Sequence, residues 1–440
     1  PRCFQRNRLV IEQPFKLIAV KVRKLAVFFL FALAALAAIA RDEARAVSKL
    51  IYREHAVVFA AVTACVAVLN LEIIYFGKID ELASYAVVVV FGGLIFFHEL
   101  GHFSVARLFN MGVSTFSLGF GPKILKKKVG KTEYALSLLP LGGYVALVGE
   151  TDEAELPEGF TKEDSFSLRP AWQRLLVVLA GPVANMLLAL ILCWIMAFTW
   201  GEHVLLPSVG AVQQDSPAFK AGLKPGDQIV AIDGKETKTW QDMSDAIAGS
   251  NGRTLSVDVM SQDGQGGGDV RKVEITPVRS QRKTIFGEDE TAWLVGVRAS
   301  GAFATNELSA SESITSGWKQ CWNMIVLTWE GFVKLIERVV PADQVGGPIM
   351  IAQVIGEQAH NGLEGLLGLA ALISINLGIL NLLPVPVLDG GTCVFCLAEI
   401  ICRRPVNKKF IDYSMRVGVA LLIALMVFAT FNDVMRIIRG

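Results

Sequence analysis

The stretch LASYAVVVVFGGLIFFHELGH, residues 82–102, decides the fold class of this 440-residue chain. Residues 82–97 carry no charge, and the run then ends in His98, Glu99 and His102. Such an apolar run predicts a membrane-spanning helix. Because ionisable groups inside a spanning helix are costly, they mark a functional site by default. The alternative is a surface helix whose polar residues face water, and the apolar flanks argue against it.

The order of these polar residues, HExxH, predicts a zinc site. Histidines four residues apart lie on one face of a helix, so both imidazoles can bind one metal ion. Glu99 lies between them, where its carboxylate can take a proton from a metal-bound water. The motif therefore suggests a metal-dependent hydrolase.

The composition places the chain among membrane proteins. Hydrophobic residues make up 52% and charged residues only 19%, and the net charge of +1 gives no indication of nucleic-acid binding. The seven cysteines are odd in number and scattered, so they imply no disulfide framework. Four uncharged runs are candidate core spans: Leu82–Arg107 up to its polar end, Leu175–Trp200, Gly365–Leu388 and Val417–Asn432.

Basic residues between these runs predict the orientation. A lysine-rich loop at residues 123–131 follows the first run, and Arg403, Arg404, Lys408 and Lys409 follow the third. By the positive-inside rule both loops are cytoplasmic, and residues 201–344 lie outside. The metal would then lie within the membrane, nearer the cytoplasm. The run Lys126–Lys128 suits either an anionic lipid surface or a solvated loop.

The first cytoplasmic loop also contains the apolar segment Tyr134–Val148, interrupted by a Pro-Leu-Gly-Gly break that includes Gly142 and Gly143. The pattern predicts a hairpin or bent strand pair that dips towards the membrane. A strand edge near the metal could bind an extended peptide by strand addition. A hairpin that only packs against the helices is the alternative.

The outer region, residues 205–300, reads as a small α+β domain inserted between the second and third core spans. SPAFKAGLKPGDQIVAIDGK, residues 216–235, is similar to a PDZ domain, and Gly264–Gly268 is expected to be a hairpin loop. Such a domain could receive a peptide or C-terminus, or act as a size filter. Residues 305–345 are expected to form an amphipathic helix on the membrane surface, with core packing as the alternative.

A third metal ligand is needed, since catalytic zinc usually has three protein ligands and a water. None of the other histidines, His55, His203 and His360, lies in a setting that favours metal binding. Asp389 is the stronger candidate, because it ends the apolar segment NLLPVPVLDGG, residues 381–391. Alternatively, Asp389 only caps the following helix.

In this order, HELGH, AGPVAN (residues 180–185), the PDZ-like insert and NLLPVPVLDGG resemble the site-2 protease family, and most closely its bacterial regulator-of-sigma-E type. The resemblance covers residues 82–436. It implies that His98, His102 and Asp389 bind one zinc ion per chain and that Glu99 is the catalytic residue. Asn381, Pro384 and Pro386 match the region that holds substrate, and Gly142 and Gly143 are added as candidate substrate-binding residues.

This chain departs from the family's pattern in two places. Many relatives of this type have two PDZ domains in tandem where one is expected here, so the way substrates are screened stays open. A histidine often follows LDGG, and here Thr392 stands at that position. Because that residue is not a ligand, activity is not put in doubt.

The resemblance implies an intramembrane zinc metalloprotease of the bacterial inner membrane, with its PDZ domain outside the cytoplasm. Its substrates would be single-pass transmembrane proteins: an anti-sigma factor after a first cleavage, or remnant signal peptides. Residues 81–200 and 346–440 would form the two parts of the protease core. A PDZ adaptor would not need Glu99 and both histidines, and a cation transporter would need further intramembrane ligands.

Residues 1–80 form an N-terminal extension of uncertain status. They hold two apolar runs, Leu25–Ala40 and Ala56–Leu71. The first is marginal for a hydrocarbon core of about 30 Å, so at most the second is expected to span the membrane.

Overall fold

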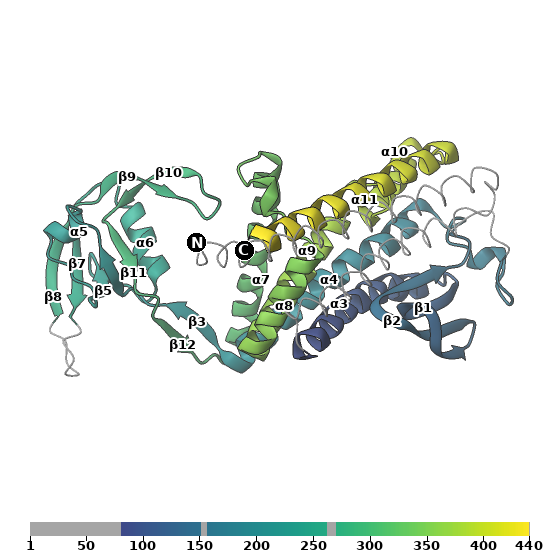
Figure 1. The fold of residues 1–440 in the computed structure, drawn as a ribbon, viewed down its shortest axis with the longest axis horizontal. Coiled ribbons are helices and arrows are strands. Elements are labelled where there is room, and N and C mark those ends of the chain that lie inside the picture. The colour runs from purple at the N-terminus through teal and green to yellow at the C-terminus, as the bar shows by residue number, and fades with distance from the viewer. Residues whose placement is uncertain (1–80, 151–155, 262–269, 440) are drawn as a thin grey trace, which may run out of the picture. The chain divides into compact units, whose positions relative to one another are not determined.

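The computed structural model describes residues 81–150, 156–261 and 270–439 (Figure 1). The expected N-terminal extension, residues 1–80, and the expected glycine-rich loop, residues 264–268, lie outside the described residues.

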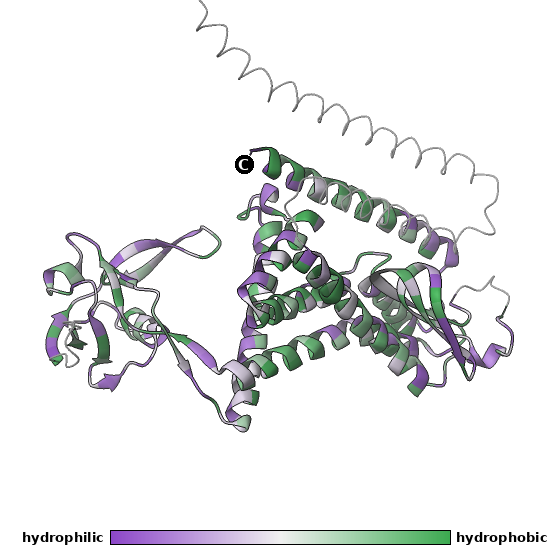
Figure 2. Cartoon of the chain, turned by 60° about the horizontal axis from the view of Figure 1, so that its bottom comes forward, coloured by the Kyte–Doolittle hydropathy of each residue, from purple (hydrophilic) through white to green (hydrophobic). Residues whose placement is uncertain are grey.

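Four of the described helices are long and apolar enough to cross a membrane. They are α3 (Glu81–Leu108), α4 (Ala171–Trp200), α9 (Leu363–Asn381) and α11 (Lys408–Arg439), and Figure 2 shows their largely hydrophobic surfaces. Helices suit this role because they satisfy their backbone hydrogen bonds internally. The four expected core spans are confirmed as apolar helices. The third helix is shorter than expected because Pro384 and Pro386, which follow it, cannot donate backbone hydrogen bonds.

Helix α4 packs against both α3 and α9. Small residues allow this close approach: a side chain on Gly101 of α3 would lie 2.2 Å from the Ala180 carbonyl oxygen of α4. On its other side, Ala189 and Cys193 of α4 are buried in a cluster with Ile375 of α9. Interfaces of small residues are typical of helices in lipid, where close van der Waals packing drives association.

Three further helices complete the helical part: α7 (Ala310–Ile336), α8 (Pro348–Asn361) and α10 (Asp389–Cys402). Helix α7 begins at a capping box formed by Ser309 and Glu312. It packs against α4, while Trp318, Trp322 and Trp329 are exposed. Helices α8 and α10 are short, and both lie outside the four apolar runs.

The strands β1 (Val113–Val129) and β2 (Thr132–Leu147) form an antiparallel sheet between α3 and α4 in the sequence. Phe116 pairs with both Tyr134 and Val145, so the first half of β1 lies between the two halves of β2. The hairpin expected within Tyr134–Val148 is therefore wrong in its pairing. The reason is that both halves of this segment pair with the preceding strand, whose lysine-rich end hid its strand character.

Residues 207–301 form a β-rich region with a core of its own. Its helices are α5 (Pro217–Lys220) and α6 (Trp240–Ala248). Its strands are β4 (Val209–Val212), β5 (Gln228–Ile232), β6 (Lys235–Glu236), β7 (Leu255–Met260), β8 (Val270–Ile275), β9 (Val278–Lys283), β10 (Asp289–Leu294) and β11 (Val297–Ala299). The four-stranded sheet has the order β6-β5-β7-β8, while β11 pairs with β4 and β10 with β9.

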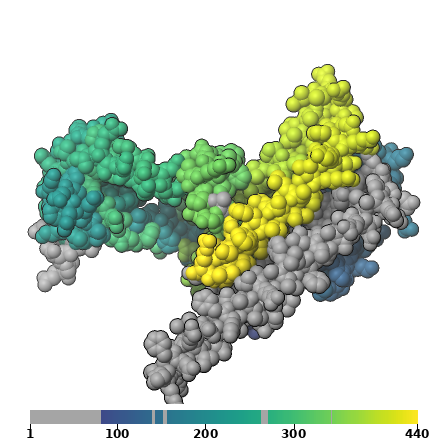
Figure 3. Space-filling model, turned by 45° about the horizontal axis from the view of Figure 1, so that its top comes forward, coloured from purple at the N-terminus to yellow at the C-terminus, as the bar shows by residue number. Residues whose placement is uncertain are grey.

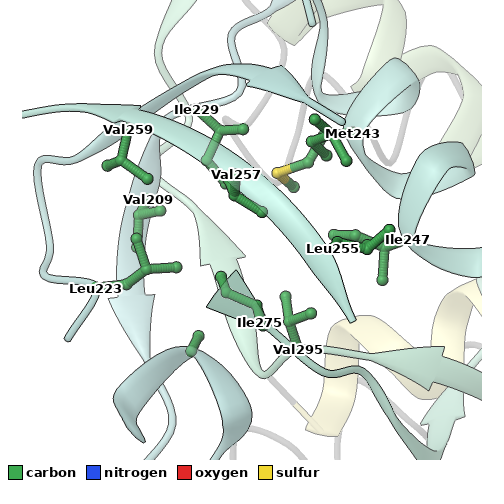
Figure 4. Packing of buried hydrophobic residues seen from close by; sticks show 12 residues of the cluster. Val209, Leu223, Ile229, Met243, Ile247, Leu255, Val257, Val259, Ile275 and Val295 are labelled. Carbon is green, nitrogen blue, oxygen red and sulfur yellow. The ribbon is translucent and has the colours of Figure 1, made fainter. Parts of the chain in front are cut away.

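The core of this region follows from alternation along its strands. Leu255, Val257 and Val259 of β7 point inwards, and Met243 and Ile247 of α6 face them (Figure 4). A strand buries alternate residues on one face, so the pattern fixes which side of the sheet faces the helix. Strand β8 ends before Pro277, which cannot donate a backbone hydrogen bond, and the β9–β10 hairpin follows it.

A two-stranded ribbon stands at the base of this region. Its strands are β3 (Glu202–Leu205), which follows α4, and β12 (Phe303–Asn306), which precedes α7. At its far end the Leu206 N–H donates to the Ala302 carbonyl oxygen over 2.9 Å. The ribbon therefore closes the insert, because the chain leaves and re-enters the helical part at neighbouring positions.

Candidate metal centre

The HELGH motif lies in the last third of α3, and His98 and His102 face the same way. Their Nε2 atoms are 3.2 Å apart. The two rings lie against α4 at a glycine: a Cβ on Gly181 would lie 2.3 Å from His102 Nε2 and 2.8 Å from His98 Cε1. The sequence AGPVAN thus provides the flat helix surface against which both imidazoles pack.

Asp389 brings a carboxylate to the same place from the start of α10. Its Oδ2 atom is 3.2 Å from His98 Nε2 and 3.5 Å from His102 Nε2. Asp389 lies far from the histidines in the sequence. The fold brings them together because α4 packs against both α3 and α10. Asp389 is the first residue of its helix, and the N-cap position is held by Leu388.

These three side chains fit a zinc ion. Two ligands at about 2.0–2.1 Å from a tetrahedral zinc are about 3.3 Å apart, close to each of the three ligand distances. Asp389 Oδ2 is buried and has no hydrogen-bond partner within the described part of the chain, as expected for an oxygen directed at a cation. Within the described ranges, this is the one group of three or more potential metal ligands.

The remaining imidazole nitrogens are held by α4. His102 Nδ1 lies 2.8 Å from the Val177 carbonyl oxygen, to which its N–H donates. His98 Nδ1 lies 3.2 Å from the side-chain amide of Asn185. Such contacts orient metal-binding histidines and fix which nitrogen carries the proton. Asn185 received no role from the sequence, although an amide in the apolar run Leu175–Trp200 was the signal that could have found it.

Glu99 contacts β2. Its Oε2 atom accepts a hydrogen bond of 3.1 Å from the Val145 N–H. Gly143 is buried beside it, since a Cβ there would lie 3.5 Å from Glu99 Cγ. Gly142 is buried against the ring of Phe120. The structure thus brings Gly143 to the HExxH motif, whereas Gly142 contacts Phe120.

The segment between α9 and α10 holds the other expected substrate-binding residues. Asn381 is the last residue of α9, Pro384 is exposed, and Pro386 is half-buried. Val387 has a φ of +86°, which is strained for a β-branched residue. The segment folds over the start of α10, where a Cβ on Gly390 would lie 2.2 Å from the Leu383 carbonyl oxygen. The segment leads directly to Asp389.

The other histidines lie elsewhere. His203 of β3 contacts Glu364 at 2.7 Å and Thr305 at 3.0 Å, and His360 lies in α8. His55 is outside the described residues.

Comparison with known proteins agrees with this site. The sequence model of Peptidase family M50 matches residues 86–425. A relative from Campylobacter jejuni, whose name describes a zinc metalloprotease, is 37% identical over 82% of this chain and 95% of its own length. A similarly named relative from Agrobacterium fabrum is 34% identical over 80% of the chain and 95% of its length. The zinc metalloprotease RasP of Geobacillus kaustophilus is 31% identical over 79% and 97%.

Proposed function

The chain belongs to Peptidase family M50 and is a zinc metalloprotease, and we propose that it cleaves single-pass membrane proteins within their transmembrane segments. One observation carries this proposal: Asp389 meets His98 and His102 beside α3 and α4, two helices that are long and apolar enough to cross a membrane. A site built from such helices favours a substrate that is itself in the membrane, since a soluble peptide would have to leave water to reach it.

The mechanism assigns one role to each side chain. His98, His102 and Asp389 would hold the zinc, which when bound acts as a Lewis acid towards water and the substrate carbonyl. Glu99 accepts the proton of the attacking water and returns it to the leaving nitrogen, as a general base and then a general acid. The Val145 N–H orients the Glu99 carboxylate for this work. His102 keeps its ring orientation through the Val177 carbonyl.

The substrate must become extended before it is cut, because the amide groups of an intact helix are engaged in hydrogen bonds. The second half of β2, Gly143–Leu147, passes Glu99 and pairs with β1 on one side. A substrate strand added along the other edge of β2, beside Glu99, would regain the hydrogen bonds that the substrate helix loses on unwinding. Asn381, Pro384 and Pro386 would support it from the side of Asp389.

The β-rich region is proposed to be a PDZ domain that binds a peptide or C-terminus. A groove of about 370 Å³ lies between α6 and the chain at β10–β11, lined in part by Trp240, Met243, Trp293 and Val297. An apolar groove beside a short strand suits an extended peptide with an apolar side chain. Recruitment of substrate and exclusion of bulky proteins both remain consistent with this groove.

The proposed location is the bacterial inner membrane, with the PDZ domain outside the cytoplasm and the metal near the cytoplasmic side. The relatives are bacterial, and the exposed lysines Lys126–Lys128 of β1 support a cytoplasmic sheet. The exposed tryptophans of α7 support contact with the membrane surface. The substrates that this arrangement suits are an anti-sigma factor after a first cleavage, and remnant signal peptides.

The test separates metal binding from catalysis. The full chain would be purified in detergent, its zinc measured by elemental analysis, and its cleavage of a single-pass substrate followed by electrophoresis. Glu99→Gln should retain about one zinc per chain and lose cleavage by a factor of about 100 or more, because it removes the general base. His98→Ala and Asp389→Ala should lose both zinc and cleavage.

Two results would contradict the assignment. Full zinc content and activity in Asp389→Ala would remove Asp389 from the ligand set. Cleavage confined to soluble peptides, with the transmembrane substrate left intact, would reject the intramembrane reaction while leaving the metal site in place.

A further inference from the structure

Asn185 is a fully buried amide in the most apolar part of the molecule. It lies in α4, with 0% of its surface exposed. Its side-chain nitrogen lies 3.2 Å from His98 Nδ1, and its Oδ1 atom is buried without a hydrogen-bond partner in the described part of the chain. A buried, unpartnered polar atom costs about 1–3 kcal/mol, so this arrangement calls for an explanation.

The proton carried by His98 shows which atom of this amide must face the imidazole. His98 Nε2 faces Asp389 and His102, so it is the nitrogen that would bind the metal. A neutral imidazole that binds metal through Nε2 carries its proton on Nδ1, and Nδ1 is then a donor. A donor needs an acceptor, whereas the atom that lies 3.2 Å from Nδ1 is the amide nitrogen, which is itself a donor. The oxygen and nitrogen of an asparagine are assigned from such hydrogen bonds, and here the opposite assignment satisfies His98.

We propose that Asn185 is a positioning residue for the metal centre: its amide oxygen accepts the Nδ1–H of His98 and holds the ring with Nε2 free for zinc. This inference rests on the metal site of the proposed function. It also explains why a polar side chain is kept in the uncharged run Leu175–Trp200, where burial of an unneeded amide would be unfavourable.

Asn185 also contacts α9 through its backbone. Ser374 of α9, itself fully buried, donates its hydroxyl to the Asn185 backbone carbonyl over 2.8 Å. A Cβ on Gly378 would lie 3.6 Å from Asn185 Cβ, so α9 approaches closely on that side. The backbone of Asn185 is thus tied to α9, and its side chain reaches α3.

The two histidines differ in a way that makes the proposal testable. His102 is oriented by the Val177 backbone carbonyl, which no substitution removes. His98 relies on the side chain of Asn185. Substitution at residue 185 should therefore weaken one of the three ligands and leave the other two in place.

The experiment measures zinc affinity of the full chain in detergent by competition with a chelator, with elemental analysis of the bound metal. Asn185→Leu keeps the branched shape, with more bulk, but has no acceptor, and we expect it to bind zinc about 10–100-fold more weakly. Asn185→Asp keeps an acceptor oxygen and should stay within about threefold of the wild type. Should the leucine variant fail to fold, Asn185→Ala makes the same test with less bulk.

Ser374→Ala is the matched control. It removes a buried hydrogen bond to the same residue without touching His98, so it should lower stability but leave zinc affinity within about twofold. The absorption spectrum of bound cobalt gives a second readout, which should change in Asn185→Leu and not in Ser374→Ala.

Unchanged zinc affinity in a folded Asn185→Leu or Asn185→Ala protein would overturn the proposal. So would equal loss in Asn185→Asp and Asn185→Leu. These measurements do not need cleavage, so they stand apart from any failure of the proposed reaction.

Discussion

At the scale of single residues, the metal centre depends on an absent side chain as much as on the ligands. Gly181 of α4 leaves the space in which His98 and His102 lie. We expect Gly181→Ala to displace both imidazoles, because the new Cβ would lie 2.3 Å from His102 Nε2. Zinc affinity should fall at least about tenfold, since metal sites require their ligand geometry. Chelator competition with the purified full chain measures this directly.

Gly93 provides the control, because it is a helical glycine in α3 with no atom within 4 Å of its would-be Cβ. Gly93→Ala should bind zinc like the wild type and be slightly more stable, by up to about 1 kcal/mol of helix propensity. Equal zinc affinity in the two variants would show that the packing of Gly181 against the imidazoles does not matter.

The sequence predicted the metal ligands better than it predicted the groups that orient them. HExxH and a carboxylate in an apolar run identify themselves, because charged groups are rare in membrane helices. Asn185 and the Val177 carbonyl could not be found in the same way. An amide is a weak signal, a backbone carbonyl is none, and both act through contacts between α3 and α4 that exist only in the folded chain.

At the scale of elements, α11 is attached to the other helices at few points. It lies at the surface in Figure 3, and its buried residues are Gly418, Ala429 and Asp433. Asp433 is fully buried and accepts hydrogen bonds from the backbone N–H groups of Gly347, Ile349 and Met350 at 2.9–3.1 Å. Its carboxylate thus caps the N-terminus of α8 from another helix, where the helix dipole favours a negative charge.

Removal of this cap should weaken the fold. We expect Asp433→Ala to lower the free energy of unfolding by about 3 kcal/mol, because it leaves three N–H groups and Arg436 without their partner. Unfolding in mixed micelles of mild detergent and dodecyl sulfate measures the change. Asp412→Ala, at an exposed position near the start of the same helix, should change it by less than about 0.5 kcal/mol. A loss of similar size in both variants would contradict the capping role.

Apolar runs predicted the long helices because one physical requirement, the thickness of the hydrocarbon, sets both length and composition. Elements outside that requirement were predicted less well. The lysines of β1 have no period-2 apolar pattern, so this strand was missed and β2 was paired wrongly. The β-rich region alternates more clearly, as in β7, where Leu255, Val257 and Val259 are buried and the residues between them are not.

At the scale of the whole molecule, metal centre and groove belong to separate cores. The groove at α6 draws on residues 211–298, and all three metal ligands lie outside this range. The chain between them passes through the β3–β12 ribbon. A deletion at the ribbon should therefore separate peptide binding from cleavage.

The β3–β12 ribbon allows the β-rich region to be deleted without opening the rest of the chain. Because Leu206 and Ala302 already share a backbone hydrogen bond, Pro207–Gly301 can be replaced by Asn-Gly, which closes a tight hairpin. The shortened protein should keep its zinc. We expect it to cleave a trimmed single-pass substrate at least about tenfold more slowly, because the wild type has a second binding site that raises the effective concentration of substrate.

Ser244→Trp, which fills the groove, should slow cleavage in the same way, whereas Asp245→Trp at the adjacent exposed position should not. Faster cleavage of substrates with intact outer domains would instead identify the region as a gate, and unchanged rates for both substrates would reject recruitment and gating alike.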